Sequence, residues 1–476
     1  MAFRVLTQVN YSAGENPDGD SGLRFIAGLL LSIVQLDPDF HFYVLVPARH
    51  AKVWMAAMQH PRITPIPIEI EPRLHGGDFQ FCPVRLSDSF DLRRFDLDVL
   101  FLNQPETVPA LLNFFNRQTF HNVPAVSYVH WFDTRRPSTP KESRHHPALL
   151  GALTGMMVSE AVGCNSQYGK ERILRRAAKW FNDATVANLA QRVGVLPPGV
   201  EVAAIEAARP TRRRRGRNRS RLQIIVNHRL LKYTGVRALL TDTFPKLWAQ
   251  RNDFSVVLTN PTRVRLPATI TRTPWLVIET LSRDTYLKQL WESDIVIAPH
   301  RACHWSISTL EAICAECVPL MNVESFFGEM MEPIVTILSD GQREHVMERW
   351  FYYRGSLLTR LNDLMDNISR EREVAKVVAA HARLTYDWSN LASRWRQLFH
   401  DAESRVPAMS ENNPSMRRIV ELVRYRTRIT KSEILSNLQW APKQRALSWT
   451  SFRKALKLVA REDPSIPESV FEFDRT

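Results

Sequence analysis

The apolar positions of this chain form short runs that alternate with longer amphipathic stretches. The run FRVLTQV at 3–9 is rich in β-branched residues, a turn-rich segment follows it, and LRFIAGLLLSIV at 23–34 has helical spacing. Further strand-like runs occur at 41–47, 97–103, 125–131 and 161–165. Short apolar strands between helices are typical of a parallel sheet covered on both faces. Residues 1–207 are therefore predicted to form a doubly wound α/β domain.

An arginine-rich segment interrupts this alternation. Residues 208–221, ARPTRRRRGRNRSR, hold eight arginines and almost no apolar side chain, which predicts a linker or an exposed arm. Strand-like runs then resume at 222–227, 254–260, 275–280, 294–299 and 318–322. We therefore expect a second doubly wound α/β domain over residues 222–385.

The pattern changes again beyond residue 407. Three short amphipathic helices are predicted in residues 407–476, where 13 Lys and Arg residues stand against 8 Asp and Glu residues. This segment is predicted to be a small basic helical module of helix-turn-helix or winged-helix character.

Composition narrows the class of protein. A chain of 476 residues is too long for one ordinary core, so more than one domain is expected. We find no run of about 18 apolar residues and no secretory signal, so we expect no membrane span and a cytoplasmic location. Five scattered cysteines argue against a disulfide scaffold. A net charge of +14 makes a polyanionic partner plausible.

The stretch PHRACHWSISTLEA at 299–312 is rich in groups that bind metal. The possible zinc ligands in and after it are His300, Cys303, His304, Cys314 and Cys317. Residues 306–316 read as a helix, however, whose ends lie about 15 Å apart at 1.5 Å per residue. One zinc ion with bonds near 2 Å cannot be bound from both ends, so we expect no metal. A thiol nucleophile at Cys303 is a second alternative, but no partner arrangement favours it.

The same stretch also fits a phosphate site. The strand at 294–299 leads through a loop to a helix that begins near Ser306, and a helix N-terminus directs free N–H groups and a positive dipole end at an anion. Glu311 lies further along that helix and could accept hydrogen bonds from sugar hydroxyls. After the strand at 222–227, Arg229 and Lys232 provide two cations at a strand end, where open α/β sheets bind ligands.

Together these segments resemble the retaining GT-B glycosyltransferases of the large family 4 type. The resemblance covers about residues 1–400 and lies in the order and spacing of the motifs DSGLR (20–24), CNSQYGKERI (164–173), LPPGV (196–200), NHRLLKYTG (227–235) and PHRACHWSISTLEAICAECVP (299–319). It implies a GT-B fold, with two Rossmann-like domains facing across a cleft. Residues 386–406 resemble the terminal helix that crosses back to the first domain.

The resemblance also implies roles for single residues. Arg229 and Lys232 would bind the donor diphosphate, Glu311 the nucleotide ribose, and His130 would lie near the reacting sugar. Cys303 stands where the family has a first glutamate, and Glu316 stands where a glycine is common. The donor-binding set is Ser21, Gly22, Arg229, Lys232, Cys303, His304, Ser306, Ile307 and Glu311, with His130, Arg229 and Glu311 as the catalytic residues. Such a site transfers sugar with retention and without metal, and it has no permanently bound cofactor. The expected donor substrate is a UDP-sugar.

Basic segments indicate the acceptor. The nucleic-acid-binding candidates are Arg135, Arg136, Lys141, Arg144, Arg212, Arg213, Arg214 and Arg215, although charge runs are often only solvated faces. The favoured partner is DNA, because bacteriophage DNA glucosyltransferases that modify hydroxymethylated bases are GT-B enzymes with basic clefts. The location would then be the host cytoplasm, and Trp131 and Phe132 could stack on a flipped base. Alternatives are a glycan, a lipid carrier or a tRNA base as acceptor, or a catalytically degenerate nucleic-acid-binding protein. The oligomeric state stays open.

Overall fold

The computed structural model describes most of the first 405 residues. The described ranges are 2–9, 21–48, 51–68, 97–112, 123–130, 132, 146–210, 221–228, 230, 234–259, 266, 268–300, 304–353 and 355–405. The predicted module at 407–476 and residues 211–220 of the arginine arm lie outside them. None of the helices in these ranges is long and apolar enough to span a membrane.

The first domain is built on a parallel sheet with the strand order β3-β2-β1-β4-β5-β6-β7. Its strands are β1 (Phe3–Gln8), β2 (Phe40–Pro47), β3 (Ile63–Ile68), β4 (Val99–Leu102), β5 (Ala125–Val129), β6 (Ala161–Cys164) and β7 (Val193–Val195). Its helical segments are α1 (Ser21–Leu36), α2 (Ala51–Ala57), η4 (Pro105–Thr107), α6 (His146–Val158), α7 (Gln167–Ala177) and α8 (Asp183–Arg192). The next helix, α9 (Val202–Ala207), packs against a helix of the second domain. The described strands that were predicted here are therefore present, and the sheet is doubly wound as expected.

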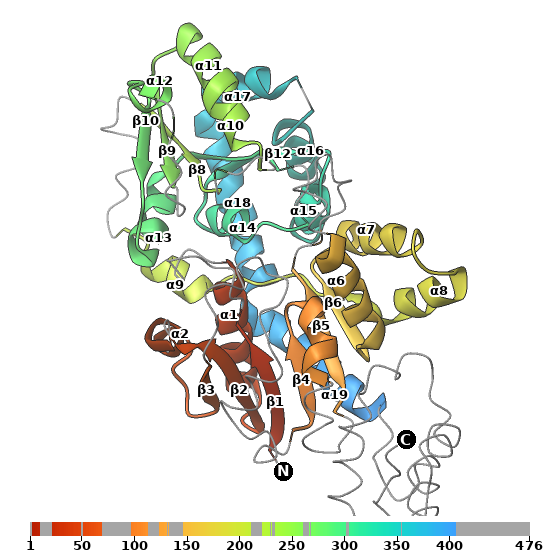
Figure 1. The fold of residues 1–476 in the computed structure, drawn as a ribbon. Coiled ribbons are helices and arrows are strands. Elements are labelled where there is room, and N and C mark those ends of the chain that lie inside the picture. The colour runs from red at the N-terminus through yellow and green to blue at the C-terminus, as the bar shows by residue number, and fades with distance from the viewer. Residues whose placement is uncertain are drawn as a thin grey trace, which may run out of the picture.

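A second parallel sheet, of order β10-β9-β8-β11-β12-β13, forms the other domain. Its strands are β8 (Leu222–Val226), β9 (Phe254–Thr259), β10 (Leu276–Glu279), β11 (Ile295–Ala298), β12 (Val318–Asn322) and β13 (Phe351–Tyr352). The helical segments are α10 (Val236–Ala238), η6 (Leu239–Thr243), α11 (Phe244–Gln250), α12 (Ala268–Thr271), α13 (Arg283–Glu292), α14 (Ile307–Cys314), α15 (Phe327–Val335), α16 (Asp340–Arg349), α17 (Leu357–Asp366) and α18 (Ile368–Tyr386). Figure 1 shows this domain stacked on the first.

The last described helix, α19 (Trp388–Arg405), returns to the first domain (Figure 1). It packs against α1 and against strands β4 and β5. The ring of Trp395 lies 5.0 Å from that of Tyr128 and 5.7 Å from that of Phe101, measured between centroids. The aromatic side chains of a C-terminal helix therefore complete the core of the N-terminal domain.

Two chain segments run side by side between the domains. The Val200 N–H donates to the carbonyl of Tyr386 at 2.8 Å, and the Trp388 N–H donates to the carbonyl of Val200 at 3.4 Å. A Cβ at Gly199 would lie 2.8 Å from the Trp388 ring and 2.9 Å from the Tyr386 carbonyl oxygen, so only glycine allows this approach. We call residues 199–201 and 386–388 the hinge segments.

A second glycine fixes the position of helix α6. A Cβ added to Gly155 would lie 1.7 Å from the backbone oxygen of Pro105 in η4, whereas at Gly151, one turn earlier, the nearest atom would be 3.4 Å away. We expect Gly155→Ala to destabilise the protein by about 2 kcal/mol, because backbone must move to accommodate the methyl group. Gly151→Ala should be neutral or stabilising by up to about 1 kcal/mol, because alanine favours the helix. Urea unfolding of both variants measures the difference, and equal stabilities would contradict this packing.

Candidate functional site

The site is centred on the first turn of α14, at the carboxyl edge of the second sheet. Ser306 is the N-cap residue, with extended backbone, and its Oγ accepts a hydrogen bond from the Thr309 N–H at 3.2 Å. Strand β11 ends at Ala298, so the helix begins beyond the carboxyl end of a central strand. Serine followed by a helix-forming segment specifies this local structure. The helix dipole and the first amide groups are therefore directed into the region where such sheets bind ligands.

Two buried histidines lie against this first turn. His228 follows β8, and its Nδ1 lies 3.1 Å from Ser308 Oγ while its Nε2 lies 3.4 Å from Thr309 Oγ1. The ring of His300, which follows β11, is 3.9 Å from the His228 ring, centroid to centroid. Burial lowers the pKa of His300 to about 4, and burial together with the neighbouring His300 lowers the pKa of His228 well below its usual value. Both rings are therefore neutral near pH 7 and act as hydrogen-bonding groups.

Glu311 lies one turn further along α14 in a buried polar network. Its Oε1 is 2.6 Å from Nη2 of Arg283, and its Oε2 accepts a hydrogen bond from the Tyr286 hydroxyl at 3.1 Å. Asn227 Nδ2 donates to the same hydroxyl at 3.1 Å and to the carbonyl of Ser308 at 2.7 Å. Burial opposes the charge of Arg283, but the attraction of Glu311 outweighs it and raises the pKa of Arg283. An ionised carboxylate has about four acceptor positions, so Glu311 can accept further hydrogen bonds.

The two domains touch beside this helix. Ser166, the N-cap residue of α7 in the first domain, donates from Oγ to the carbonyl of His304 at 2.8 Å. Glu329 of α15 accepts hydrogen bonds from the backbone N–H groups of Gln167 and Tyr168, the latter at 3.0 Å. A carboxylate from one domain thus binds the N-terminus of a helix in the other. His304, directly before α14, is therefore held at the contact between the domains.

The structure brings together part of the predicted site. Ser306, Ile307 and Glu311 lie in the first turns of α14, with His304 directly before the helix. His130 follows β5 in the other domain, where its carbonyl accepts from Asn165 Nδ2 at 2.9 Å and its ring lies 5.7 Å from that of Phe25. Ser21 and Gly22 are the first two residues of α1. Arg229, Lys232 and Cys303 lie outside the described residues.

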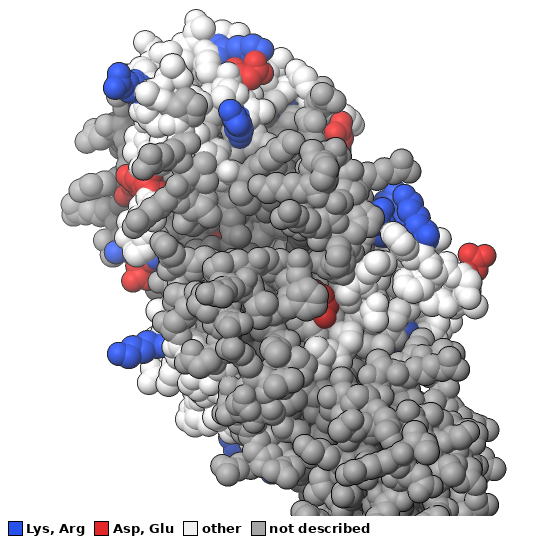
Figure 2. All heavy atoms as spheres, viewed as in Figure 1, with Lys and Arg blue, Asp and Glu red and all other residues white. Residues whose placement is uncertain are grey.

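The predicted nucleic-acid-binding residues cannot be placed. Arg135, Arg136, Lys141, Arg144 and Arg212 to Arg215 are outside the described ranges, and so is Trp131. Phe132 is buried in the core of the first domain with 3% of its surface exposed, so it is not available to stack on a base. On the face shown in Figure 2, the described basic and acidic side chains are spread over both domains and form no single basic patch.

Several residues of the site were not predicted from sequence. They are Asn227, His228, Arg283, Tyr286, Ser166 and Glu329. Only their positions at the start of a helix or directly after an apolar strand could have indicated them. The thiols of Cys314 and Cys317 are buried, and burial raises the pKa of Cys314. Across the described ranges, no three His, Cys, Asp or Glu side chains are grouped as a metal site requires.

Comparison with solved structures identifies the architecture. The chain is similar to the sucrose-phosphate synthase of Thermosynechococcus elongatus, with a TM-score of 0.64 and 11% identity over 85% of this chain and 100% of the other. The chain has the GT-B fold. The chain is also similar in fold to the catalytic domain of starch synthase IV from Arabidopsis thaliana bound to ADP and acarbose, with a TM-score of 0.59 and 10% identity over 85% of this chain and 100% of the other.

A third similar structure contains a nucleotide-sugar. It is the HepE protein of Anabaena in complex with UDP-glucose, with a TM-score of 0.57 and 11% identity over 83% of this chain and 99% of the other.

No family model and no curated protein matches the chain by sequence. The expectation of a GT-B fold, with two Rossmann-like domains, is thus confirmed. The site around α14 belongs to the second of these domains and lies beside the contact with the first.

Proposed function

We propose that the protein is a glycosyltransferase that moves a sugar from a nucleotide-sugar to an acceptor hydroxyl. The observation that carries this proposal is the first turn of α14: a capped helix N-terminus, two neutral histidines and the buried Glu311 lie beside the domain contact of a GT-B fold. Helix-end amides suit a diphosphate, and a buried carboxylate suits ribose hydroxyls. UDP-glucose and ADP in two similar structures support a nucleoside diphosphate as the ligand, and we propose UDP.

The proposed roles follow the position of each group along the donor. Arg229, Lys232 and the amides at the start of α14 would neutralise the diphosphate, and Glu311 would accept hydrogen bonds from the ribose. The same part of the donor site would contain His304, Ser306 and Ile307, with Cys303 towards the sugar. Ser21, Gly22 and His130 would approach the sugar from the first domain. The site needs no metal for this charge stabilisation, because cations and helix dipole provide it.

The proposed reaction retains the configuration at the anomeric carbon. The bond between the anomeric carbon and the diphosphate oxygen breaks, and a bond from the acceptor oxygen forms on the same face of the sugar. The acceptor proton passes to the departing phosphate oxygen, so the products are a nucleoside diphosphate and a glycoside. Charge stabilisation of the leaving group is the main contribution that this site can make.

The proposed acceptor is a hydroxymethylated base in DNA. The net charge of +14 and the basic segments at 135–146 and 208–221 support a polyanionic partner. A base within duplex DNA would have to be flipped out before its hydroxyl reached the donor. Because basic side chains would bind the DNA phosphates, the affinity for DNA should fall steeply as the salt concentration rises.

A donor and acceptor panel tests both parts of the proposal. The protein is incubated with radiolabelled UDP-, GDP- and ADP-sugars and with hydroxymethylated DNA, unmodified DNA and tRNA, followed by nucleoside mass spectrometry. We expect label from a UDP-sugar on hydroxymethylated DNA, and an approximately 100-fold lower rate for Arg229→Ala because one charge-stabilising contact is lost. Transfer to tRNA alone would contradict the DNA acceptor. If the protein neither transfers sugar from any of the nucleotide-sugars nor hydrolyses any of them, the glycosyltransferase proposal is contradicted.

A further inference from the structure

The C-terminal end of α14 contains a strained residue. Among the described non-glycine residues, only Glu316 has a positive φ, 64°, and it lies two residues beyond the last residue of the helix. This left-handed conformation is unfavourable for a residue with a side chain and is favoured by glycine. Glu316 is also 4% exposed, so a carboxylate is buried where glycine would fit without strain. Strain of this kind persists only where the surroundings hold it.

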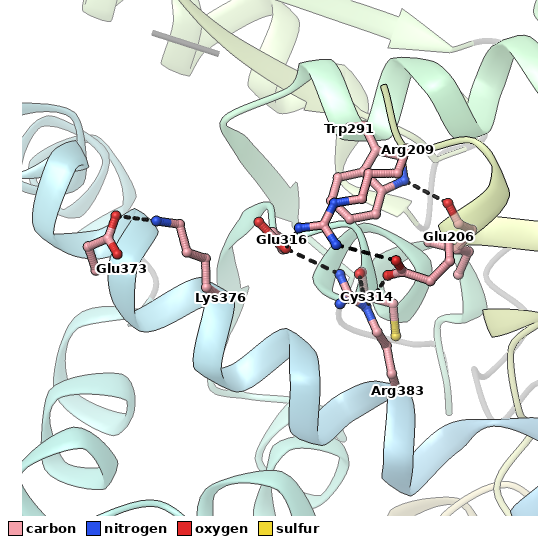
Figure 3. A network of polar contacts seen from close by, with 9 residues as sticks. Glu206, Arg209, Trp291, Cys314, Glu316, Glu373, Lys376 and Arg383 are labelled. Atoms are coloured by element: carbon pink, nitrogen blue, oxygen red, sulfur yellow. Dashed lines mark hydrogen bonds and ion pairs between the residues drawn. The ribbon is translucent and has the colours of Figure 1, made fainter. Parts of the chain in front are cut away.

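Two arginines hold the Glu316 carboxylate, one that follows the first hinge segment and one that precedes the second (Figure 3). Arg209, just after α9, places Nη2 3.1 Å from Glu316 Oε1, and Arg383, near the end of α18, places Nη2 3.5 Å from the same oxygen. Arg383 also donates from Nε to the carbonyl of Cys314 at 2.8 Å. The two chain segments that connect the domains are therefore both attached to the end of α14.

An indole and a second carboxylate complete this cluster. The guanidinium carbons of Arg209 and Arg383 lie 4.9 Å and 5.3 Å from the centroid of the Trp291 ring. Trp291 Nε1 donates to the carbonyl of Ile205 in α9 at 2.7 Å. Glu206 binds both arginines, with Oε1 2.9 Å from Arg383 Nε and Oε2 3.4 Å from Arg209 Nη1. The cluster thus joins α9, α13, α14 and α18.

Stability alone does not account for a glutamate at this position. A buried ion pair is often no more stabilising than well-packed uncharged groups, since the loss of hydration offsets the attraction. Glycine would also remove the backbone strain at φ 64°. What the Glu316 carboxylate adds is geometry: it fixes α9 and α18 relative to α14.

We propose that Glu316 is a positioning residue that sets how the two domains close over the donor. The eight-residue helix α14 has the donor site at its first turn and the hinge attachments just beyond its last. A short helix is rigid over this length, so an orientation fixed at one end is transmitted to the other. The donor end of this inference rests on the proposed function, whereas the hinge end rests on the contacts of Glu316 alone.

The test is the variant Glu316→Gly. Glycine adopts the positive φ of this position without strain, and the substitution removes the ion pairs with Arg209 and Arg383. Small-angle X-ray scattering of the full chain, with and without UDP, reports how far the domains open. We expect the pair-distance distribution of the variant to shift to longer distances, because fewer molecules hold the closed arrangement. The donor KM should rise about 3- to 10-fold with a smaller change in kcat, because affinity falls with the fraction of competent molecules.

Matched variants make the result decisive. Glu373→Gln removes an exposed ion pair with Lys376, which also lies on α18 (Figure 3), and should leave scattering and KM unchanged. If Glu316→Gly does not fold, Arg209→Gln tests the same contact, because the Arg209 side chain is 42% exposed and less needed for folding. Wild-type scattering in either folded variant would overturn the proposal. If no sugar transfer is found, the scattering result still decides the role of Glu316 at the hinge, while the glycosyltransferase proposal fails separately.

Discussion

Replacing Trp395 by alanine is expected to destabilise the protein by about 3–5 kcal/mol, the usual cost of truncating a buried tryptophan. The Trp395 side chain has no exposed surface and contacts the rings of Phe25, Phe101 and Tyr128. The variant would leave a cavity between α19 and the first sheet. Because Trp395 of α19 packs against aromatic side chains of the first domain, the loss of stability should fall on that domain.

Guanidinium unfolding followed by fluorescence and circular dichroism measures this effect. Trp180→Ala is the matched control, because Trp180 is 45% exposed and its truncation should change the free energy of unfolding by less than about 0.5 kcal/mol. Equal effects of the two variants would show that α19 does not complete the core of the first domain.

Replacing Glu311 by glutamine is expected to lower kcat/KM for the nucleotide-sugar by about 10- to 100-fold, because hydrogen bonds to a charged group contribute about 1.5–3 kcal/mol. The glutamine oxygen can still accept from the Tyr286 hydroxyl, so the fold should persist. The ion pair with Arg283 is lost, however, and the ribose meets a neutral amide instead of a carboxylate.

Initial rates over a range of donor concentrations measure this effect, with circular dichroism to verify folding. Asp284→Asn provides the control, since Asp284 is an exposed carboxylate on the same helix as Arg283 and should leave the rate unchanged. A folded Glu311→Gln protein with wild-type kcat/KM would remove Glu311 from the donor site.

Much of the fold could be predicted because buried parallel strands are continuous apolar runs. Strands β4 and β11, with the sequences VLFL and IVIA, stood out in this way. Strand β3 was missed, since its sequence ITPIPI contains two prolines, which are tolerated there because β3 is the edge strand of its sheet. Strand β13 was also missed, because two residues show no periodicity.

Only those features of the candidate site that lie within one continuous segment of the chain could be predicted from the sequence. A serine before a helical segment indicated the start of α14, and the same helix placed Glu311. The partners of these groups come from remote positions: Arg283 from α13, and Ser166 from another domain. Glu316 and Arg209 are likewise 107 residues apart. Single-sequence periodicity specifies which face of an element is buried, but not which polar groups meet across elements.

Hydrogen–deuterium exchange with and without UDP tests the central claim most directly. The account predicts that UDP slows exchange in the first turn of α14, residues 306–310, and directly after β8, at residues 227 and 228, because a bound ligand would stabilise the helix N-terminus and shield its free amide groups. Exchange at α8, on the outer part of the first domain, should not change. If UDP, ADP and GDP all leave exchange at 306–310 unaltered, the first turn of α14 is not a donor site and the glycosyltransferase proposal is contradicted.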